Sequence, residues 1–385
     1  MLNTLLKPVL LLSVVVLALS ACGKKEEAPA GAAVEQAVVV KIGAVSPLTG
    51  AQSHLGKDIE SGIRMAIDEA NAGGVTLGGK QVTFELASED DMADPRTATI
   101  VAQKLVDEQI KGVIGHLNSG ASIPASRIYS DAGIPQISPA STAVAYTAQG
   151  YKTTFRVMTN DAQQGKVLGE FAVKTLGGKS VAIIDDRTAY GQGLADEVAA
   201  AVKAAGGSVV AREFTTDKST DFTAILTAIK GKKPDVIFFG GMDPQGALLV
   251  RQMKSLGLSA KLLGGDGLQS SNFLTLAGAD AEGTYASSPG QPLALMPGGS
   301  EFSEKFNAKY GVIQIYSPYA YDATRAMIDA MKRADSATPA NYLPELVKTN
   351  FTGVTGPIAF DDKGDILGGA VTVYQAQGGE WVVAK

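Results

Sequence analysis

Hydroxyl groups and backbone donors gather where a strand-like apolar run, Lys111–Leu117, passes into a predicted helix. Ser119 and Gly120 stand at the start of that helix. The unpaired N–H groups and positive dipole end of a helix N-terminus favour an anion, and a serine hydroxyl adds a donor. This segment therefore predicts a carboxylate-binding site. The alternative interpretation is that Asn118 or Ser119 only caps the helix.

Two further segments carry polar groups after predicted strands. Ala140, Ser141 and Thr142 follow the strand Ile134–Ser138, and Asp266 stands between two glycines after a short strand. Ligands of open α/β sheets bind at the carboxyl ends of strands, where these groups would meet. Taken alone, each segment also fits an ordinary polar turn. Together, hydroxyls for a carboxylate and an acid for an ammonium group predict a site for an α-amino acid.

Enzyme signatures are mostly absent from the sequence. It has one Cys and two His, and it lacks the G-x-S-x-G, Walker A, H-E-x-x-H and C-x-x-C motifs. His116 ends an apolar strand and fits a hydrogen-bonded core residue. His54 precedes a helix, where it either reaches a ligand or faces solvent. We therefore expect no enzymatic activity, no cofactor and no metal site.

Overall composition excludes other classes. The 385 residues carry a formal charge of −5 and are 45% hydrophobic, which is ordinary for a globular protein. A chain of this length suggests two domains. Nucleic acid is not an expected partner, because that affinity comes mostly from cations that meet phosphates.

The first residues are interpreted as a targeting sequence. Lys7 precedes the apolar run Val9–Leu19, which is too short to span a bilayer and typical of a signal peptide, assigned to residues 1–21. Small residues then lead into Cys22, as in the bacterial lipobox, whose Cys is acylated. The alternative is an ordinary secretory signal with an incidental Cys. Residues 22–37 are polar and small and predict a flexible tether. We expect a protein of the cell envelope, held at the membrane by its lipid anchor alone.

The rest of the chain alternates between strands and helices. Val38–Val45 is a β-branched run, and the helical spacing of apolar residues over Gly56–Ala72 ends at paired glycines. A second set begins at the strand Ser180–Asp185 and the helix Gly191–Ala205. This order predicts parallel sheets with helices on both faces, in two similar lobes that face each other across a cleft.

The sequence resembles the periplasmic leucine/isoleucine/valine-binding proteins of ABC transporters, the type I solute-binding proteins. The matching segments, in order along residues 38–385, are Val113–Leu117, Pro124–Ser126, Ile137–Pro139, Tyr190–Ala195, Gly240–Gly241, Arg251–Gln252, Gly356–Pro357 and Asp362–Asp365. The resemblance implies two lobes that close on a ligand by a hinge motion. The implied lobes are residues 38–159 with 289–367 and residues 160–288 with 368–385, joined by crossings near 158–161, 287–291 and 366–369.

The resemblance also implies roles for individual residues. Ser119 and Thr142 match the family's carboxylate-binding serine and its partner threonine. Ala140 matches the residue whose backbone carbonyl accepts from the ammonium group, with Ser141 beside it. Asp266 matches the acid of the second lobe that binds the ammonium group, and Tyr190 matches a tyrosine that covers the ligand.

Some positions depart from the family's pattern. Leu55 and Met242 stand where the family has aromatic residues, so flexible aliphatic side chains replace rigid rings and the preferred ligand side chain changes. Asp266 replaces a longer glutamate. The family's small disulfide is lost, since its positions match Ala93 and Asn118.

These observations predict a monomeric substrate-binding component of an ABC importer. It would capture an aliphatic amino acid, with a branched chain favoured, and deliver it to a membrane permease. The alternative is a receptor of the same fold for amides, urea or aromatic acids.

Overall fold

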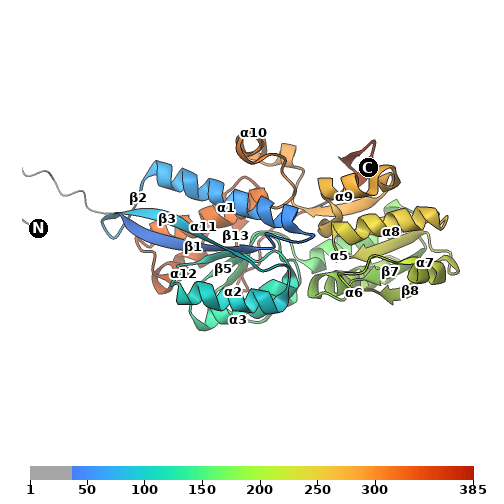
Figure 1. Ribbon diagram of the computed structural model, residues 1–385, viewed down its shortest axis with the longest axis horizontal. Helices are drawn as coiled ribbons and strands as arrows, with labels where there is room; N and C mark the ends of the chain where they lie inside the picture. The colour runs from blue at the N-terminus through green and yellow to red at the C-terminus, as the bar shows by residue number, and fades with distance from the viewer. Residues whose placement is uncertain (1–36) are drawn as a thin grey trace, which may run out of the picture. The chain divides into compact units, whose positions relative to one another are not determined.

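The computed structural model describes residues 37–385. The predictions of a signal peptide, of lipidation at Cys22 and of most of the tether lie outside the described residues. Two separate sheets organise the described chain, each with helices on both faces (Figure 1). This confirms the α/β class that the strand and helix alternation predicts.

The first sheet has the strand order β2–β3–β1–β4–β5–β6. Its strands are β1 (Val38–Ser46), β2 (Val75–Leu77), β3 (Lys80–Asp90), β4 (Val113–Gly115), β5 (Gln136–Ser138) and β6 (Thr154–Arg156). The helices of this part are α1 (Ser53–Gly73), α2 (Pro95–Asp107), α3 (Ser119–Asp131), α4 (Ala145–Ala148), α10 (Gly299–Tyr310), α11 (Ser317–Arg333) and α12 (Pro339–Val347). Helices α1 and α11 pack together on one face, and α2 and α3 pack together on the other (Figure 1).

The second sheet has the order β15–β14–β11–β10–β9–β7–β8. Its strands are β7 (Ser180–Asp185), β8 (Ser208–Phe214), β9 (Val236–Gly240), β10 (Lys261–Gly264), β11 (Tyr285–Pro289), β14 (Val371–Gln377) and β15 (Glu380–Val383). The surrounding helices are α5 (Asp161–Glu170), α6 (Ala189–Ala204), α7 (Thr223–Lys230), α8 (Asp243–Ser255) and α9 (Ser271–Ala277). A π-helical turn (Phe171–Thr175), three 3₁₀ turns (Asp266–Leu268, Gly278–Ala281 and Leu293–Leu295) and the hairpin β12–β13 (Asn350–Thr352, Pro357–Ala359) complete the structure.

Alternating side chains of the second sheet enter two cores. Val181 and Ile183 pack into the same core as α5 and α6, whereas Ala182 and Ile184 pack with α7, α8 and α9. This period of two is what a strand covered on both faces requires. The sheet is therefore fixed between two helical layers, and its strand ends provide a rigid base for a site.

The sheets are not wholly parallel, which corrects one expectation. Strands β2, β14 and β15 run antiparallel to their neighbours, whereas the other pairings within the two sheets are parallel. All three lie at or near a sheet edge. Short hairpins join β2 to β3 and β14 to β15, whereas β14 reaches its other neighbour, β11, only after a long excursion of the chain through α10, α11 and α12. The predicted strand at Lys111–Leu117 is also shorter, as only Val113–Gly115 pairs in the sheet.

Helix α1 begins three residues before its predicted start, at Ser53. His54 and Leu55 therefore lie in its first turn and not in a loop. Gly56 misled the prediction because glycine usually interrupts helices. Here it allows close packing, since a Cβ at this position would lie 2.0 Å from the carbonyl oxygen of Pro47.

Three connections between the two sheets run side by side. A groove is lined by Val157–Thr159, by Gly290 and Gln291, and by Ile366–Ala370. Backbone bonds join them, for example from the Gly290 N–H to the Ala370 carbonyl (2.7 Å). The exact lobe boundaries stay a prediction.

Candidate functional site

A small cavity lies where the carboxyl ends of strands from both sheets meet. It is lined by Leu117, Asn118, Ser119, Ala140, Tyr190, Met242, Asp266 and Tyr316. Five of the predicted site residues are therefore brought together: Ser119, Ala140, Tyr190, Met242 and Asp266. The free space is about 10 Å³, roughly the room of one water molecule. An amino acid can enter only if the walls move apart.

The start of α3 offers donors to this cavity. Asn118 does not cap the helix with its side chain, which turns instead to donate from Nδ2 to Oε1 of Gln52 (2.8 Å). The Ser119 Oγ accepts from the Ala143 N–H (3.1 Å), which leaves its hydroxyl hydrogen free to donate. The interpretation of this segment as a helix cap alone is wrong, and its groups suit a bound carboxylate.

The hydroxyl groups in the loop after β5 have two roles: some hold the loop in shape, and one is near the site. Ser138 accepts from the N–H of Ser141 (2.8 Å), and the Ser141 Oγ bonds to Ser122 (2.5 Å) and to the Leu117 carbonyl (3.0 Å). Ser141 therefore shapes the loop. Thr142 is buried, and no group of the described residues bonds to its Oγ1 at full hydrogen-bond geometry. Its hydroxyl faces the carboxyl of Asp161 and lowers the pKa of that group.

Gly120 lies at the start of α3 but does not line the cavity. A Cβ built at Gly120 would lie 3.9 Å from the Cβ of Ala189, so this position faces the start of α6. A small residue here lets the two helices approach each other. Gly120 can contribute its backbone N–H but no side chain.

Asp266 is the buried carboxylate of the site. Its Oδ1 accepts from the Tyr190 hydroxyl (2.9 Å) and its Oδ2 from the Tyr316 hydroxyl (2.7 Å). Burial raises its pKa above the ordinary value, while these hydrogen bonds oppose the rise. Sequence reasoning missed Tyr316, because it lies far along the chain from the other site residues and no local pattern marks it.

Asp161 is a second buried acid, which sequence reasoning also missed. Its backbone N–H donates to the Thr142 carbonyl (2.8 Å), and its Oδ2 has no partner among the described residues. Burial and the charge of Asp266 raise its pKa to about 8. Asp161 follows strand β6, so the rule that picked out the other strand-end residues would have found it.

The two histidines and Leu55 lie outside the cavity lining. His54 places Nε2 2.7 Å from Oδ2 of Asp243, and Leu55 is fully buried in the core. His116 is buried with Nδ1 2.7 Å from Asp91 and Nε2 3.3 Å from the Tyr129 hydroxyl, which confirms the prediction of a hydrogen-bonded core residue.

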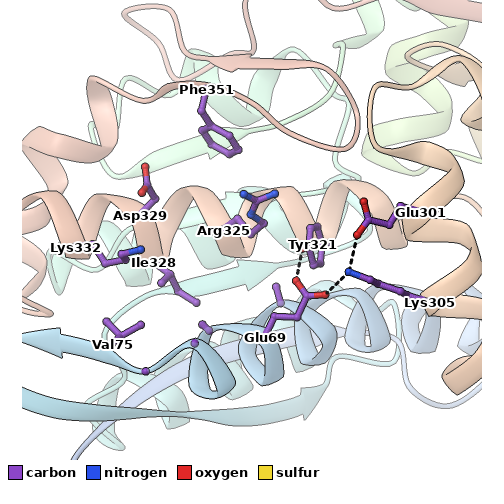
Figure 2. Close-up of a pocket in the computed structure, with 14 residues that line it drawn as sticks. Glu69, Val75, Glu301, Lys305, Tyr321, Arg325, Ile328, Asp329, Lys332 and Phe351 are labelled. Atoms are coloured by element: carbon purple, nitrogen blue, oxygen red, sulfur yellow. Dashed lines mark hydrogen bonds and ion pairs between the residues drawn. The ribbon is translucent and has the colours of Figure 1, made fainter.

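A second cavity, of about 550 Å³, lies between α1, α10 and α11 (Figure 2). It contains none of the predicted site residues. Its charges are mutually paired or balanced: Figure 2 shows Lys305 bridging Glu301 (2.8 Å) and Glu69 (3.8 Å), and Glu69 also accepts from the Tyr321 hydroxyl. The residues that the sequence places at the strand ends therefore do not meet in this second cavity.

Within residues 37–385, no cluster of three or more His, Cys, Asp or Glu side chains is placed to hold a metal ion. Across the same residues, no helix combines the length and the apolar character needed to cross a membrane.

Comparison with known proteins places these features in a family. Residues 39–380 match the family model described as periplasmic binding protein. A Leu/Ile/Val-binding protein homolog of Brucella abortus is 36% identical over 85% of this chain and 87% of its own length. A protein of Pseudomonas aeruginosa, named as binding leucine, isoleucine, valine, threonine and alanine, is 34% identical over 87% of this chain and 89% of its own.

Solved structures agree with the sequence matches. The leucine-binding protein LivK of Thermotoga maritima superposes with a TM-score of 0.84 at 30% identity, over 90% of this chain and 98% of its own. LivJ of Streptococcus pneumoniae, solved in complex with isoleucine, gives 0.80 at 28% identity, over 90% of this chain and 100% of its own. A solute-binding protein of an ABC transporter from R. palustris, solved in complex with benzoate, shares the fold at 21% identity and a TM-score of 0.80, over 90% of this chain and 95% of its own.

Proposed function

The chain belongs to the periplasmic binding protein family, and from this premise we propose that it is the substrate-binding component of an ABC importer for an aliphatic amino acid, with a branched chain favoured. The relatives named for leucine, isoleucine and valine support this ligand class. So does the isoleucine bound to the Streptococcus pneumoniae relative.

The observation that carries the proposal is the pairing of donors and acids across one cavity. Ser119 and the start of α3 present donors on one side, and Asp266 presents a buried carboxylate on the other. An α-amino acid carries a carboxylate and an ammonium group on one carbon, and both must be paired when they leave water. Ser119 with Thr142 would hold the carboxylate, and Asp266 with Asp161 and the Ala140 carbonyl would hold the ammonium group.

The apolar part of the lining would receive the ligand side chain. Leu117 and Met242 are buried and contribute flexible aliphatic groups, and Tyr316 closes the cavity beside them. Methionine adapts its shape to different neighbours. We therefore expect the site to accept amino acids with several kinds of aliphatic side chain. Their affinities should differ less from one another than they would in a site lined by rigid aromatic rings.

Ligand entry requires the two sheets and their helices to separate as lobes. The three connections that lie side by side near Val157–Thr159, Gly290 and Ile366–Ala370 are the natural hinge, because no other covalent link joins the two sheets within residues 37–385. A ligand that bridges Ser119 and Asp266 interacts with both lobes only when they are together. That difference in affinity favours the closed form.

The closed protein would deliver its ligand to a membrane permease, which supplies the energy of transport. The family places the protein in the periplasm. We further propose that acylation of Cys22 anchors it to a membrane and that residues 22–37 act as a tether for a monomer. The lipobox-like segment and the polar composition of that stretch support these finer assignments.

Replacement of the acid tests the proposal directly. Asp266→Asn keeps the shape of the side chain but removes its charge, so the affinity for leucine should fall at least about tenfold, since a hydrogen bond to a charged group is worth about 1.5–3 kcal/mol. Isothermal titration calorimetry measures this affinity. Asp362→Asn, at an exposed position, is the matched control and should bind as the parent does. Unchanged affinity in Asp266→Asn would refute the ammonium assignment.

The site argues against the alternative ligand class. An aromatic acid such as benzoate has a carboxylate but no cation, so it would leave Asp266 and Asp161 buried beside an added negative charge. Urea and simple amides would leave the carboxylate-binding donors of α3 without an anion. The likeness to the benzoate-bound structure therefore concerns the fold and not the ligand.

A further inference from the structure

A single charged contact joins the N-terminus of α1 to the N-terminus of α8. The His54 Nε2 lies 2.7 Å from Oδ2 of Asp243. Asp243 is fully buried, whereas the His54 side chain is 22% exposed. Helix α1 packs on the first sheet and α8 belongs to the second, so this contact runs from one proposed lobe to the other.

The carboxylate of Asp243 is held in place by its own lobe. The Ser270 hydroxyl (2.7 Å) and Nδ2 of Asn272 (2.9 Å) both donate to the same oxygen that meets His54. Ser270 is itself fixed, because its Oγ accepts from the Phe273 N–H (2.9 Å) at the start of α9. These bonds keep the Asp243 carboxylate in the same orientation whether or not His54 is present. Asp243 lies in the first turn of α8, where the helix dipole favours a negative charge.

Neither residue lines the ligand cavity, but Asp243 immediately follows Met242, which does. A second contact between the same two parts, from the Ser271 hydroxyl to Gln314 (2.7 Å), is exposed. A hinge motion that admits a ligand must break the bond between His54 and Asp243, while the bonds of Asp243 to Ser270 and Asn272 survive.

We infer that His54 and Asp243 form a latch that stabilises the closed form and slows ligand release without touching the ligand. The latch gives the closed form an interaction that the open form lacks, and such a difference shifts the population toward closure. Because the latch breaks during opening, its removal acts on dissociation more than on the encounter with the ligand. The effect on ligand release rests on the proposed function, but the effect on closure does not.

The test compares three variants of helix α1 in the refolded protein. His54→Ala removes the latch at a partly exposed position that tolerates alanine in a helix. His54→Gln keeps one N–H donor and should act as a partial rescue. Arg64→Ala is the matched control, because it breaks an exposed ion pair with Glu60 (2.9 Å) within α1 itself.

Stopped-flow fluorescence with leucine measures association and dissociation separately. For His54→Ala the dissociation rate should rise about tenfold, the effect of one lost hydrogen bond to a charged group, with the association rate within about twofold. His54→Gln should fall between the parent and His54→Ala, and Arg64→Ala should match the parent. An unchanged dissociation rate, or an equal loss in Arg64→Ala, would overturn the latch.

A measurement without ligand tests the latch independently of whether leucine is the ligand. Two spin labels, one on each lobe, report the fraction of closed molecules by their distance distribution. His54→Ala should shift that distribution to longer distances without any ligand, and Arg64→Ala should not. If the parent protein fails to bind leucine, the proposed function fails, and the distance distribution alone then decides the latch. An unchanged distribution in His54→Ala would reject it.

Discussion

Asp161 is the residue whose ionisation should control the site. Burial and the charge of Asp266 raise its pKa to about 8, so in the ligand-free protein it takes up a proton as the pH falls through that value. An ammonium group favours the ionised carboxylates, and its binding must therefore release the proton. The two acids act as a coupled pair, so the proton belongs to both.

We predict that the affinity for leucine rises with pH between 6 and 8. At pH values below the pKa of Asp161, binding of each leucine releases at most one proton. The affinity then rises by at most about tenfold for each pH unit. Calorimetric titration at pH 7 in two buffers of different ionisation enthalpy measures the released proton directly. Asp161→Asn should abolish this release, and Asp362→Asn should retain it. Release of no proton by the parent protein contradicts this prediction.

Sequence reasoning located single residues well where local rules apply. Ser119, Ala140 and Asp266 each follow a strand, and the rule that ligands bind at strand ends places them in one cavity. The sequence did not predict contacts in which the hydrogen-bond partner is distant along the chain. The hydroxyls of Ser138 and Ser141 look alike in the sequence, but only the fold shows their partners: Ser138 accepts from the backbone of its own loop, and Ser141 donates to the Leu117 carbonyl after β4.

At the scale of elements, the start of α11 is fixed by a single acid on α1. The Asp58 carboxylate accepts from the backbone N–H groups of Gln314 (3.1 Å), Ile315 (3.1 Å), Tyr316 (2.7 Å) and Ser317 (2.9 Å). These bonds aim the Tyr316 hydroxyl at Asp266. Helices α1 and α11 therefore help to position a residue that lines the site.

We predict that Asp58→Ala lowers the free energy of unfolding by about 3 kcal/mol, because it leaves several buried N–H groups unpaired at about 1–3 kcal/mol each, with partial relaxation. Urea denaturation of the ligand-free protein measures this loss. Asp68→Ala, on an exposed part of α1, is the control and should change stability by about 0.5 kcal/mol or less. A loss below about 1 kcal/mol for Asp58→Ala would show that α11 is positioned by other contacts.

The elements themselves were predictable where their signals are local. The strand Ser180–Asp185 falls where the sequence predicts it, and the helix predicted at Gly191–Ala205 is α6 (Ala189–Ala204). The antiparallel strands β14 and β15 do carry a local hairpin signal, since the two-residue turn Gly378–Gly379 joins them. What no local pattern indicates is the pairing of β14 with the distant β11. The start of α1 was missed because Gly56 allows close backbone packing there instead of ending a helix.

On the scale of the whole molecule, the proposed function depends on two lobes that share one site. Ser119 follows a strand of the first sheet and Asp266 a strand of the second, and we propose that the lobes separate at the three adjacent connections. The cavity of about 10 Å³ has no room for leucine until they do so. The two-lobed organisation could be predicted from the repeated strand and helix order, but the contacts that hold the lobes together could not, because each joins residues far apart in the chain.

The central claim is that this site requires both charges of an amino acid. The measurement that tests it most directly is thermal unfolding of the protein, refolded to remove bound amino acids, with leucine and with 4-methylpentanoate, which lacks only the ammonium group. At 100 times its dissociation constant leucine should add about 2.7 kcal/mol of stability, and 4-methylpentanoate and benzoate should add almost none. Equal stabilisation by leucine and 4-methylpentanoate, or stabilisation by benzoate alone, would contradict the account.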